Sequence, residues 1–435
     1  MARLLPVARV TYSEAIQFLR GLQMFGVTFG LETTRQLCRA AGNPHDKLQF
    51  IHVAGTNGKG STCAMLETIY RAAGLRVGLY TSPHLVSFRE RIQVNRELIS
   101  EADVMRLVDE SQRWLHTLPA DTAATFFEVV TVMALRYFAE QRCNLVIWET
   151  GLGGRLDATN IVTPLASVIT NVQFDHEKWL GDSLENIARE KAGIIKARVP
   201  VVTGVEDSRA LEVISEIAAQ QLAPLHTITN EDVARVPKNL PVAGEHQRIN
   251  AAVALRVVQV LNGALPVTPE IERDGLKHLR WPARFQVVTR GSQTIVLDGA
   301  HNPAGARALV DAVRSKFPSQ SLTLVLGVLE DKNWRDVCHT LAPLAAEIIT
   351  VPVASARSAD AAQLAAACRE ANPNVRTRTE PSCAEALKSS SGASLILLTG
   401  SLYFVGEAIE VLGLSTAPGE RALNEWTPPA QRSGN

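Results

Sequence analysis

The chain has 435 residues, of which 46% are hydrophobic and 20% charged, so it is long enough for two or three domains with full cores. Its 44 Lys and Arg residues balance its 44 Asp and Glu residues, which excludes a global electrostatic attraction to nucleic acid or to an anionic membrane. No apolar run approaches about 18 residues, residues 1–20 lack a secretory signal, and six scattered cysteines form no C-x-x-C pair, so we expect a cytoplasmic protein with reduced thiols.

The first strong pattern is a glycine-rich turn between a predicted strand at residues 50–53 and a predicted helix at residues 62–73. Such a turn presents backbone N–H groups and a helix N-terminus to a phosphate, and Lys59 can reach the outer phosphates. The turn departs from G-x-x-x-x-G-K-[ST] at Val53 and Gly60, so a turn with an exposed lysine is the alternative. We predict a nucleotide triphosphate site formed by Gly55, Thr56, Asn57, Gly58, Lys59, Gly60 and Ser61.

Strands and helices then alternate along the chain. Strands are predicted at residues 76–80, 144–149, 165–170 and 199–203, and helices at 101–118, 126–140, 184–195, 208–221, 247–261 and 269–279. This alternation predicts an α/β fold with a P-loop-type, doubly wound and mostly parallel sheet in the first domain, which we place at residues 1–282.

The segment from Arg280 to Arg284 breaks the helical pattern, so we place the domain boundary after Pro282. A second, shorter alternation of strands and helices at residues 293–412 predicts a smaller Rossmann-like α/β domain over residues 283–416. The polar, proline-containing residues 417–435 are predicted to form a mobile tail.

Polar residues follow several predicted strands, at the edge where open α/β sheets bind ligands. Ser82, Glu149 and His176, with Asp175 beside it, are such residues. A hydroxyl, a carboxylate and an imidazole close to the phosphate turn could hold a divalent cation that bridges nucleotide oxygens. The alternative is that Glu149 is a local cap and His176 an ordinary loop residue.

Three further residues have two readings each. Lys191 lies within a predicted helix and is either an exposed helical lysine or part of the site. Asp298 and His301 follow the strand predicted at residues 293–297, so they either contact the nucleotide or serve as turn and capping residues.

Eight motifs occur in order, and together they resemble one known family. They are Gly55–Ser61, Thr81–Leu85, Gly151–Asn160, Asp175-His176, Glu190–Gly193, His246-Gln247-x-x-Asn250, Trp281–Arg284 and Asp298–Pro303. The chain resembles the folylpolyglutamate synthases, especially the bacterial bifunctional dihydrofolate synthase/folylpolyglutamate synthases, which are relatives of the Mur peptidoglycan ligases. The resemblance runs from about Thr28 to Gly406.

This resemblance implies an ATP-dependent, amide-forming ligase. ATP would phosphorylate a pterin carboxylate, and the amine of L-glutamate would attack the resulting acyl phosphate. The implied substrates are dihydropteroate, reduced folates and L-glutamate, and the implied cofactors are ATP and Mg2+, with a monovalent cation as an addition. The first domain would bind ATP and pterin, the second would serve glutamate ligation, and the protein would be a monomer.

The resemblance also implies roles for individual residues. Catalytic roles fall to Lys59, His176 and Lys191, and nucleotide contacts beyond the phosphate turn to Asn250, Arg284, Asp298 and His301. The Mg2+ ligands would be Ser82, Glu149, His176 and Lys191, the last of which matches a lysine that is often carbamylated. The pterin would contact Thr28, Phe29, Gly30, Leu31, Thr125, Phe126, Phe127, Glu128, Leu156, Asp157 and Ala158.

Other functions stay open from the sequence. One is a folylpolyglutamate synthase without dihydrofolate synthase activity, another is a Mur-type ligase for a different acid, and a third is a nucleotide-dependent switch. Two positions depart from the family pattern: Thr150 stands where Val is common and Ala283 where Gly is common. The second would matter only if the backbone there has a positive φ.

Overall fold

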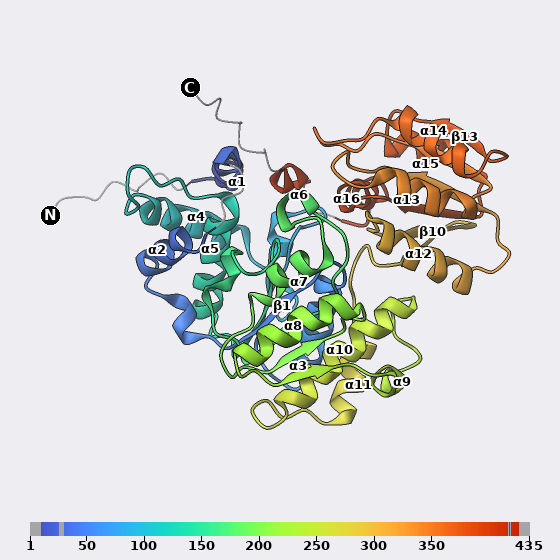
Figure 1. The fold of residues 1–435 in the computed structure, drawn as a ribbon. Coiled ribbons are helices and arrows are strands. Elements are labelled where there is room, and N and C mark those ends of the chain that lie inside the picture. The colour runs from blue at the N-terminus through green and yellow to red at the C-terminus, as the bar shows by residue number, and fades with distance from the viewer. Residues whose placement is uncertain (1–9, 26–29, 416, 418, 426–435) are drawn as a thin grey trace.

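The structure is a computed structural model that describes residues 10–25, 30–415, 417 and 419–425. It contains two α/β domains, each built on its own sheet (Figure 1). The N-terminal sheet has the strand order β4-β3-β2-β5-β1-β6-β7-β8 and is parallel except at β3 and β4. Its strands are β1 (Phe50–Ala54), β2 (Val77–Tyr80), β3 (Ile92–Val94), β4 (Glu97–Leu98), β5 (Leu145–Glu149), β6 (Ala166–Ile169), β7 (Val201–Thr203) and β8 (Leu225–Thr227).

Helices cover both faces of this sheet because alternate residues of its buried strands point to opposite sides. Phe50 and Trp148 join the core under α1, α2, α4 and α5, whereas Ile51 and Ile147 join the core under α3, α10 and α11. The helices are α1 (Tyr12–Gly21), α2 (Glu32–Ala40), α3 (Lys59–Ala72), α4 (Glu101–Leu115), α5 (Phe126–Glu140), α6 (Glu177–Leu180), α7 (Leu184–Ala192), α8 (Ser208–Gln220), α9 (Asn230–Arg235), α10 (Glu245–Leu261) and α11 (Pro269–Lys277).

The C-terminal domain, orange to red in Figure 1, has a smaller sheet of order β13-β12-β11-β14-β10-β9, parallel except at β9. The strands are β9 (Gln286–Arg290), β10 (Gln293–Leu297), β11 (Leu322–Leu326), β12 (Glu347–Thr350), β13 (Arg376–Thr379) and β14 (Leu395–Thr399). The helices are α12 (Pro303–Lys316), α13 (Trp334–Leu341), α14 (Ala361–Ala371), α15 (Cys383–Ser389) and α16 (Leu402–Val411). The predicted fold class, two mostly parallel α/β sheets of unequal size, is confirmed. Within the described ranges, no helix is both long and apolar enough to cross a bilayer.

Residues 419–425, which we call the C-terminal strap, contact the N-terminal domain. The Glu420 carboxylate accepts hydrogen bonds from Phe88 N (2.7 Å) and Ser87 Oγ (3.1 Å), and Leu423 is buried in the N-terminal core. The carboxylate and the leucine of this polar segment thus have partners that lie far away in the chain. The mobility of residues 417–435 stays a prediction.

The joint between the domains contains two residues with left-handed backbone conformations. Ala283 has φ 57° and Phe285 has φ 48°, and the Asp298 carboxylate accepts a hydrogen bond from Phe285 N at 2.8 Å. The departure from glycine at Ala283 therefore matters, because its Cβ costs about 1 kcal/mol in this conformation. The boundary itself, between residues 282 and 283, stays a prediction.

His52, on strand β1 of the N-terminal sheet, is fully buried, and its Nε2 is 2.9 Å from Thr159 Oγ1. Burial lowers the pKa of His52 to about 3. Because the unfolded chain takes up the proton at a higher pH than the folded one, stability is lost as pH falls from 6.5 toward 3, by up to about 1.4 kcal/mol per pH unit. Between pH 6.5 and 4.5, the free energy of unfolding measured in urea should therefore fall less in His52→Gln than in the parent. Equal decreases in the two proteins would contradict this prediction.

Candidate active site

One cavity of about 450 Å³ lies between the two domains and gathers most of the predicted residues. Its N-terminal wall includes the phosphate turn, and its C-terminal wall includes the ends of β10 and β14. The predicted residues that line it are Gly30, Gly55–Ser61, Ser82, Thr125–Glu128, Glu149, Leu156–Ala158, His176, Lys191, Asn250, Arg284, Asp298 and His301. Leu31 is not among the lining residues, and Thr28 and Phe29 lie outside the described residues.

The phosphate turn runs from the end of β1 to the first residue of α3. Gly58 has φ 81°, and a Cβ there would lie 2.3 Å from Asn250 Oδ1, so both conformation and space require glycine. Lys59 Nζ donates to the carbonyls of Gly55 (3.1 Å) and Thr56 (3.3 Å), inside the cavity. Ser61 Oγ is buried without a protein partner. An unpartnered hydroxyl and a lysine at a helix N-terminus fit an anionic ligand.

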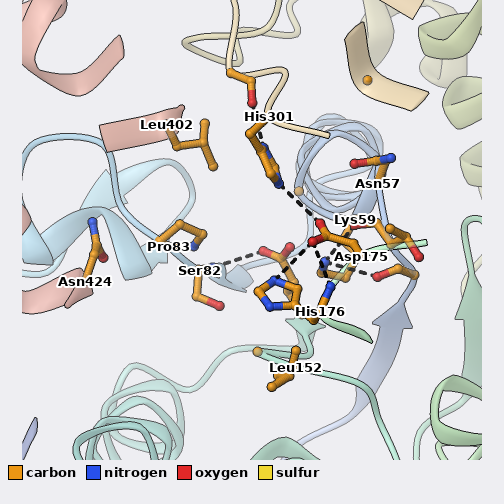
Figure 2. A pocket seen from close by; sticks show the side chains of 18 of the residues that line it. Asn57, Lys59, Ser82, Pro83, Leu152, Asp175, His176, His301, Leu402 and Asn424 are labelled. Carbon is orange, nitrogen blue, oxygen red and sulfur yellow. Dashed lines mark hydrogen bonds and ion pairs between the residues drawn. The ribbon is translucent and has the colours of Figure 1, made fainter. Parts of the chain in front are cut away.

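The predicted metal ligands all line the cavity. Glu149 ends β5, and its carboxylate accepts a hydrogen bond from Ser82 N at 3.0 Å (Figure 2). Burial raises the pKa of Glu149 to about 7, and burial together with the charge of Lys59 lowers the pKa of Lys191 to about 7. Lys191, on α7, is therefore a buried lysine with an accessible neutral form, and the reading as an exposed helical lysine is wrong.

These residues fit Mg2+ only in combination with other oxygen donors. In the part of the chain that the structure describes, no group of three His, Cys, Asp or Glu side chains could hold a metal ion by itself. The hard oxygens of Ser82 and Glu149 suit Mg2+, which usually takes one or two protein carboxylates and completes its shell with phosphate oxygens and water. A carbamate on Lys191 would add a second carboxylate-like ligand.

Asp175 forms the main polar contact between the domains. Its carboxylate pairs with His301 Nε2 at 3.5 Å (Figure 2). It also pairs with Lys332 Nζ at 2.7 Å and accepts a hydrogen bond from Asn302 Nδ2 at 3.2 Å. Burial opposes ionisation, yet the hydrogen bond from His301 and the charge of Lys332 hold the pKa of Asp175 well below its usual range. A stable carboxylate therefore ties the strand-end loop of one domain to the other.

His176 lies beside this contact. Its Nε2 is 3.2 Å from Lys332 Nζ, and burial together with that ammonium lowers the pKa of His176 to about 3. His176 is thus a neutral imidazole at physiological pH, as a metal ligand must be.

The segments predicted to hold the pterin also line the cavity. Thr125 and Glu128 form a capping box at the start of α5, with Thr125 N donating to the Glu128 carboxylate at 2.8 Å. The Asp157 carboxylate accepts hydrogen bonds from Leu152 N (2.8 Å) and Thr159 N (3.0 Å). These polar groups hold their own loops in place, so they offer a flat ligand a rigid wall with few free acceptors.

Asp298 stabilises the loop that carries Arg284. One carboxylate oxygen accepts from Phe285 N (2.8 Å) and the other from Ala300 N (2.9 Å). We expect Asp298→Ala to raise the KM for ATP by about tenfold or more, because one buried and one partly buried N–H group lose their acceptor beside Arg284, a predicted nucleotide contact. Steady-state kinetics at varied ATP would test this, with Asp311→Ala on α12 as a control; an unchanged KM would remove Asp298 from the nucleotide site.

The cavity also has charged lining residues that were not among the predicted site residues, including Lys332 and Arg357. Asn302, which donates to Asp175, was not among them either and does not line the cavity. Lys332 follows β11 and Arg357 follows β12. The rule that ligands bind beyond the carboxyl ends of parallel strands points to both residues.

Comparisons with known proteins agree with this geometry. The model of the Mur ligase middle domain matches residues 53–258, and the model of the Mur ligase glutamate ligase domain matches residues 283–402. The dihydrofolate synthase/folylpolyglutamate synthase of Bacillus subtilis is 34% identical over 91% of this chain and 98% of its own. The folylpolyglutamate synthase of Lacticaseibacillus casei is 34% identical over 93% and 99%. The solved Escherichia coli structure in complex with DHPP and ADP has a TM-score of 0.83 and 30% identity, and covers 94% of this chain and 99% of that one.

A phosphate turn that faces a second α/β domain across a shared cavity defines a Mur-type amide ligase. The chain belongs, within the Mur ligase superfamily, to the family of dihydrofolate synthases and folylpolyglutamate synthases.

Proposed function

We propose that this protein is an ATP-dependent ligase that adds L-glutamate to dihydropteroate, giving dihydrofolate, and to reduced folates, giving polyglutamates. The observation that carries the proposal is the phosphate turn, with Lys59 and the unpartnered Ser61 hydroxyl, on the same cavity as Asp298 and His301 of the second domain. Relatives named for both activities, and a similar structure solved in complex with DHPP and ADP, support it.

The reaction divides into two steps. The γ-phosphate of ATP passes to the carboxylate of the acid substrate, while the turn's N–H groups and Lys59 stabilise its charge. The amine of L-glutamate then attacks the acyl phosphate, and the tetrahedral adduct collapses to the amide and inorganic phosphate with loss of a proton. Ser82, Glu149, His176 and Lys191 would hold Mg2+, which supplies positive charge against the phosphate oxygens. A cavity between two domains suits this chemistry, because water would hydrolyse an acyl phosphate.

Turnover with two acids tests the proposal. ADP release with ATP, Mg2+ and L-glutamate should occur with dihydropteroate and also with tetrahydrofolate. Activity on tetrahydrofolate alone would leave a monofunctional folylpolyglutamate synthase, an alternative that the equal identity to the L. casei relative supports. Release of ADP that does not depend on glutamate would favour the nucleotide switch.

The setting of this activity is part of the proposal. We place ATP and pterin binding in residues 1–282 and glutamate ligation in residues 283–416, and we expect a cytoplasmic monomer that uses a monovalent cation beside Mg2+. All six cysteines are buried and unpaired, which suits a reducing compartment. Mass photometry would test the monomeric state, and the effect of K+ on turnover would test the use of a monovalent cation.

A further inference from the structure

Arg357 and the C-terminal strap line part of the cavity. Arg357 lies in the loop after β12, with 17% of its side chain exposed, and lines the same cavity as Lys59. Its Nε is 3.2 Å from a Glu425 carboxylate oxygen, and its Nη2 donates to Tyr403 Oη at 2.7 Å. Its Nη1 is 3.2 Å from Asp331. The guanidinium is thus held in position by the second domain, with one edge turned to the strap.

Glu425, the last residue of the strap, places its own carboxylate in the cavity. Its backbone carbonyl accepts a hydrogen bond from Gln23 Nε2, and its side chain, 26% exposed, pairs with Arg357. Gln23, Arg357 and Glu425 all line the cavity. Because the Glu425 side chain is partly exposed and lines the cavity, a carboxylate from solution can reach Arg357 and replace it.

The other cations on this side of the cavity are more firmly engaged. Lys332 pairs with Asp175, and Arg91 is buried and donates to His84 and to Asn424 of the strap. The side chains of Lys332 and Asp175 are 8% and 7% exposed, and Arg91 and His84 are buried, whereas Glu425, which pairs with Arg357 beside Asp331 and Tyr403, is 26% exposed. Arg357 is therefore the cation best placed to exchange its partner.

We propose that Arg357 is a binding site for a carboxylate of a glutamyl group, and that Glu425 occupies this site when the substrate is absent. The inference rests on the proposed function, because that function supplies the ligand. Two sources share the chemistry: the incoming L-glutamate and the terminal glutamyl residue of a folate tail. Guanidinium and carboxylate match in shape and charge, which makes arginine suited to such recognition.

Two variants separate this proposal from a purely structural role of the pair. Arg357→Gln should raise the KM for the carboxylate substrate by about tenfold, because a charge-assisted contact is lost. Glu425→Gln should lower the same KM by about threefold, because the internal competitor is weakened. If the pair only fastens the strap, both variants should change KM in the same direction and lower the Tm together, and that result would overturn the proposal.

The kinetics also identify the source. A change in the KM for L-glutamate, with tetrahydrofolate saturating, assigns the site to the incoming amino acid. A change confined to the KM for tetrahydrofolate triglutamate, and absent for the monoglutamate, assigns it to the tail. No change in either overturns the proposal. Glu410→Gln is the matched control, because Glu410 pairs with Arg421 of the strap but does not line the cavity.

A measurement without turnover separates this inference from the proposed function. The Tm of the full chain with AMP-PCP and Mg2+ can be titrated with L-glutamate or tri-γ-glutamate. A stabilisation that weakens in Arg357→Gln and strengthens in Glu425→Gln would support the site even if the parent showed no ligase activity. Parent turnover with no such opposed shifts in KM or Tm would instead retain the function and reject the site.

Discussion

Replacing Lys59 by alanine should lower glutamate-dependent ADP release by about a thousandfold. Lys59 is the first residue of α3, and its ammonium lies in the cavity on the carbonyls of its own turn. Loss of a positioned cation removes stabilisation of the charge that moves with the transferred phosphoryl group, while the fold keeps its turn. Coupled-enzyme detection of ADP measures the effect, and the Tm should stay close to that of the parent.

Lys388→Ala is a matched control for this experiment. Lys388 is 79% exposed in the second domain and pairs only loosely with Glu385 at 3.7 Å, so its loss should leave turnover unchanged. Normal turnover by Lys59→Ala would count against the phosphate role of the turn, and against the proposed function with it.

The second large effect is expected at Lys191. Its pKa of about 7 means that the neutral amine, which reacts with carbon dioxide, predominates above pH 7 and is lost below it. Turnover should therefore fall as pH drops through 7 and rise with added bicarbonate, and Lys191→Ala should lose about a hundredfold in kcat because a metal ligand is missing. A carbamate signal in 13C NMR with labelled bicarbonate would report the modification directly.

Lys196→Ala provides the comparison. Burial lowers the pKa of Lys196 too, but its Nζ donates to the Asn160 carbonyl at 3.3 Å and it does not line the cavity. The carbamate signal should persist in this variant and vanish in Lys191→Ala. A signal present in both variants would place the carbamate elsewhere.

Local patterns were enough to predict much of the fold. Buried strands such as residues 145–149, which alternate along the chain with helices such as residues 126–140, have few alternatives to a parallel sheet covered on both faces. The phosphate turn was predictable for the same reason, since strand, glycine-rich turn and helix lie together in sequence. Because ligands bind beyond the carboxyl ends of parallel strands, Ser82, Glu149 and His176 were predictable as site residues, and all three line the cavity.

Features that depend on distant partners were not predictable. β3 and β4 are three and two residues long, too short for a periodic signal. The strap has a polar sequence, and only Ser87 and Phe88, more than 300 residues away, explain why Glu420 is buried. The left-handed backbone of Ala283 gives no sign in its own side chain. Lys332 and Asp175 lie in different domains, so their ion pair depends on how the two domains pack and leaves no local pattern in the sequence.

The strap and the joint at residues 283–285 together mean that the chain passes between the two domains twice. Figure 1 shows the strap, in dark red, between α1 and α16, and it contacts both domains: α1 on one side, and Glu410 and Arg357 of the second domain on the other. If the domains move as rigid bodies, the joint and the strap restrict their relative motion to rotation about the line between these two connections. Opening and closing of the cavity should therefore follow a single swinging coordinate, along which a disulfide or a fluorescent pair could be placed to count open molecules.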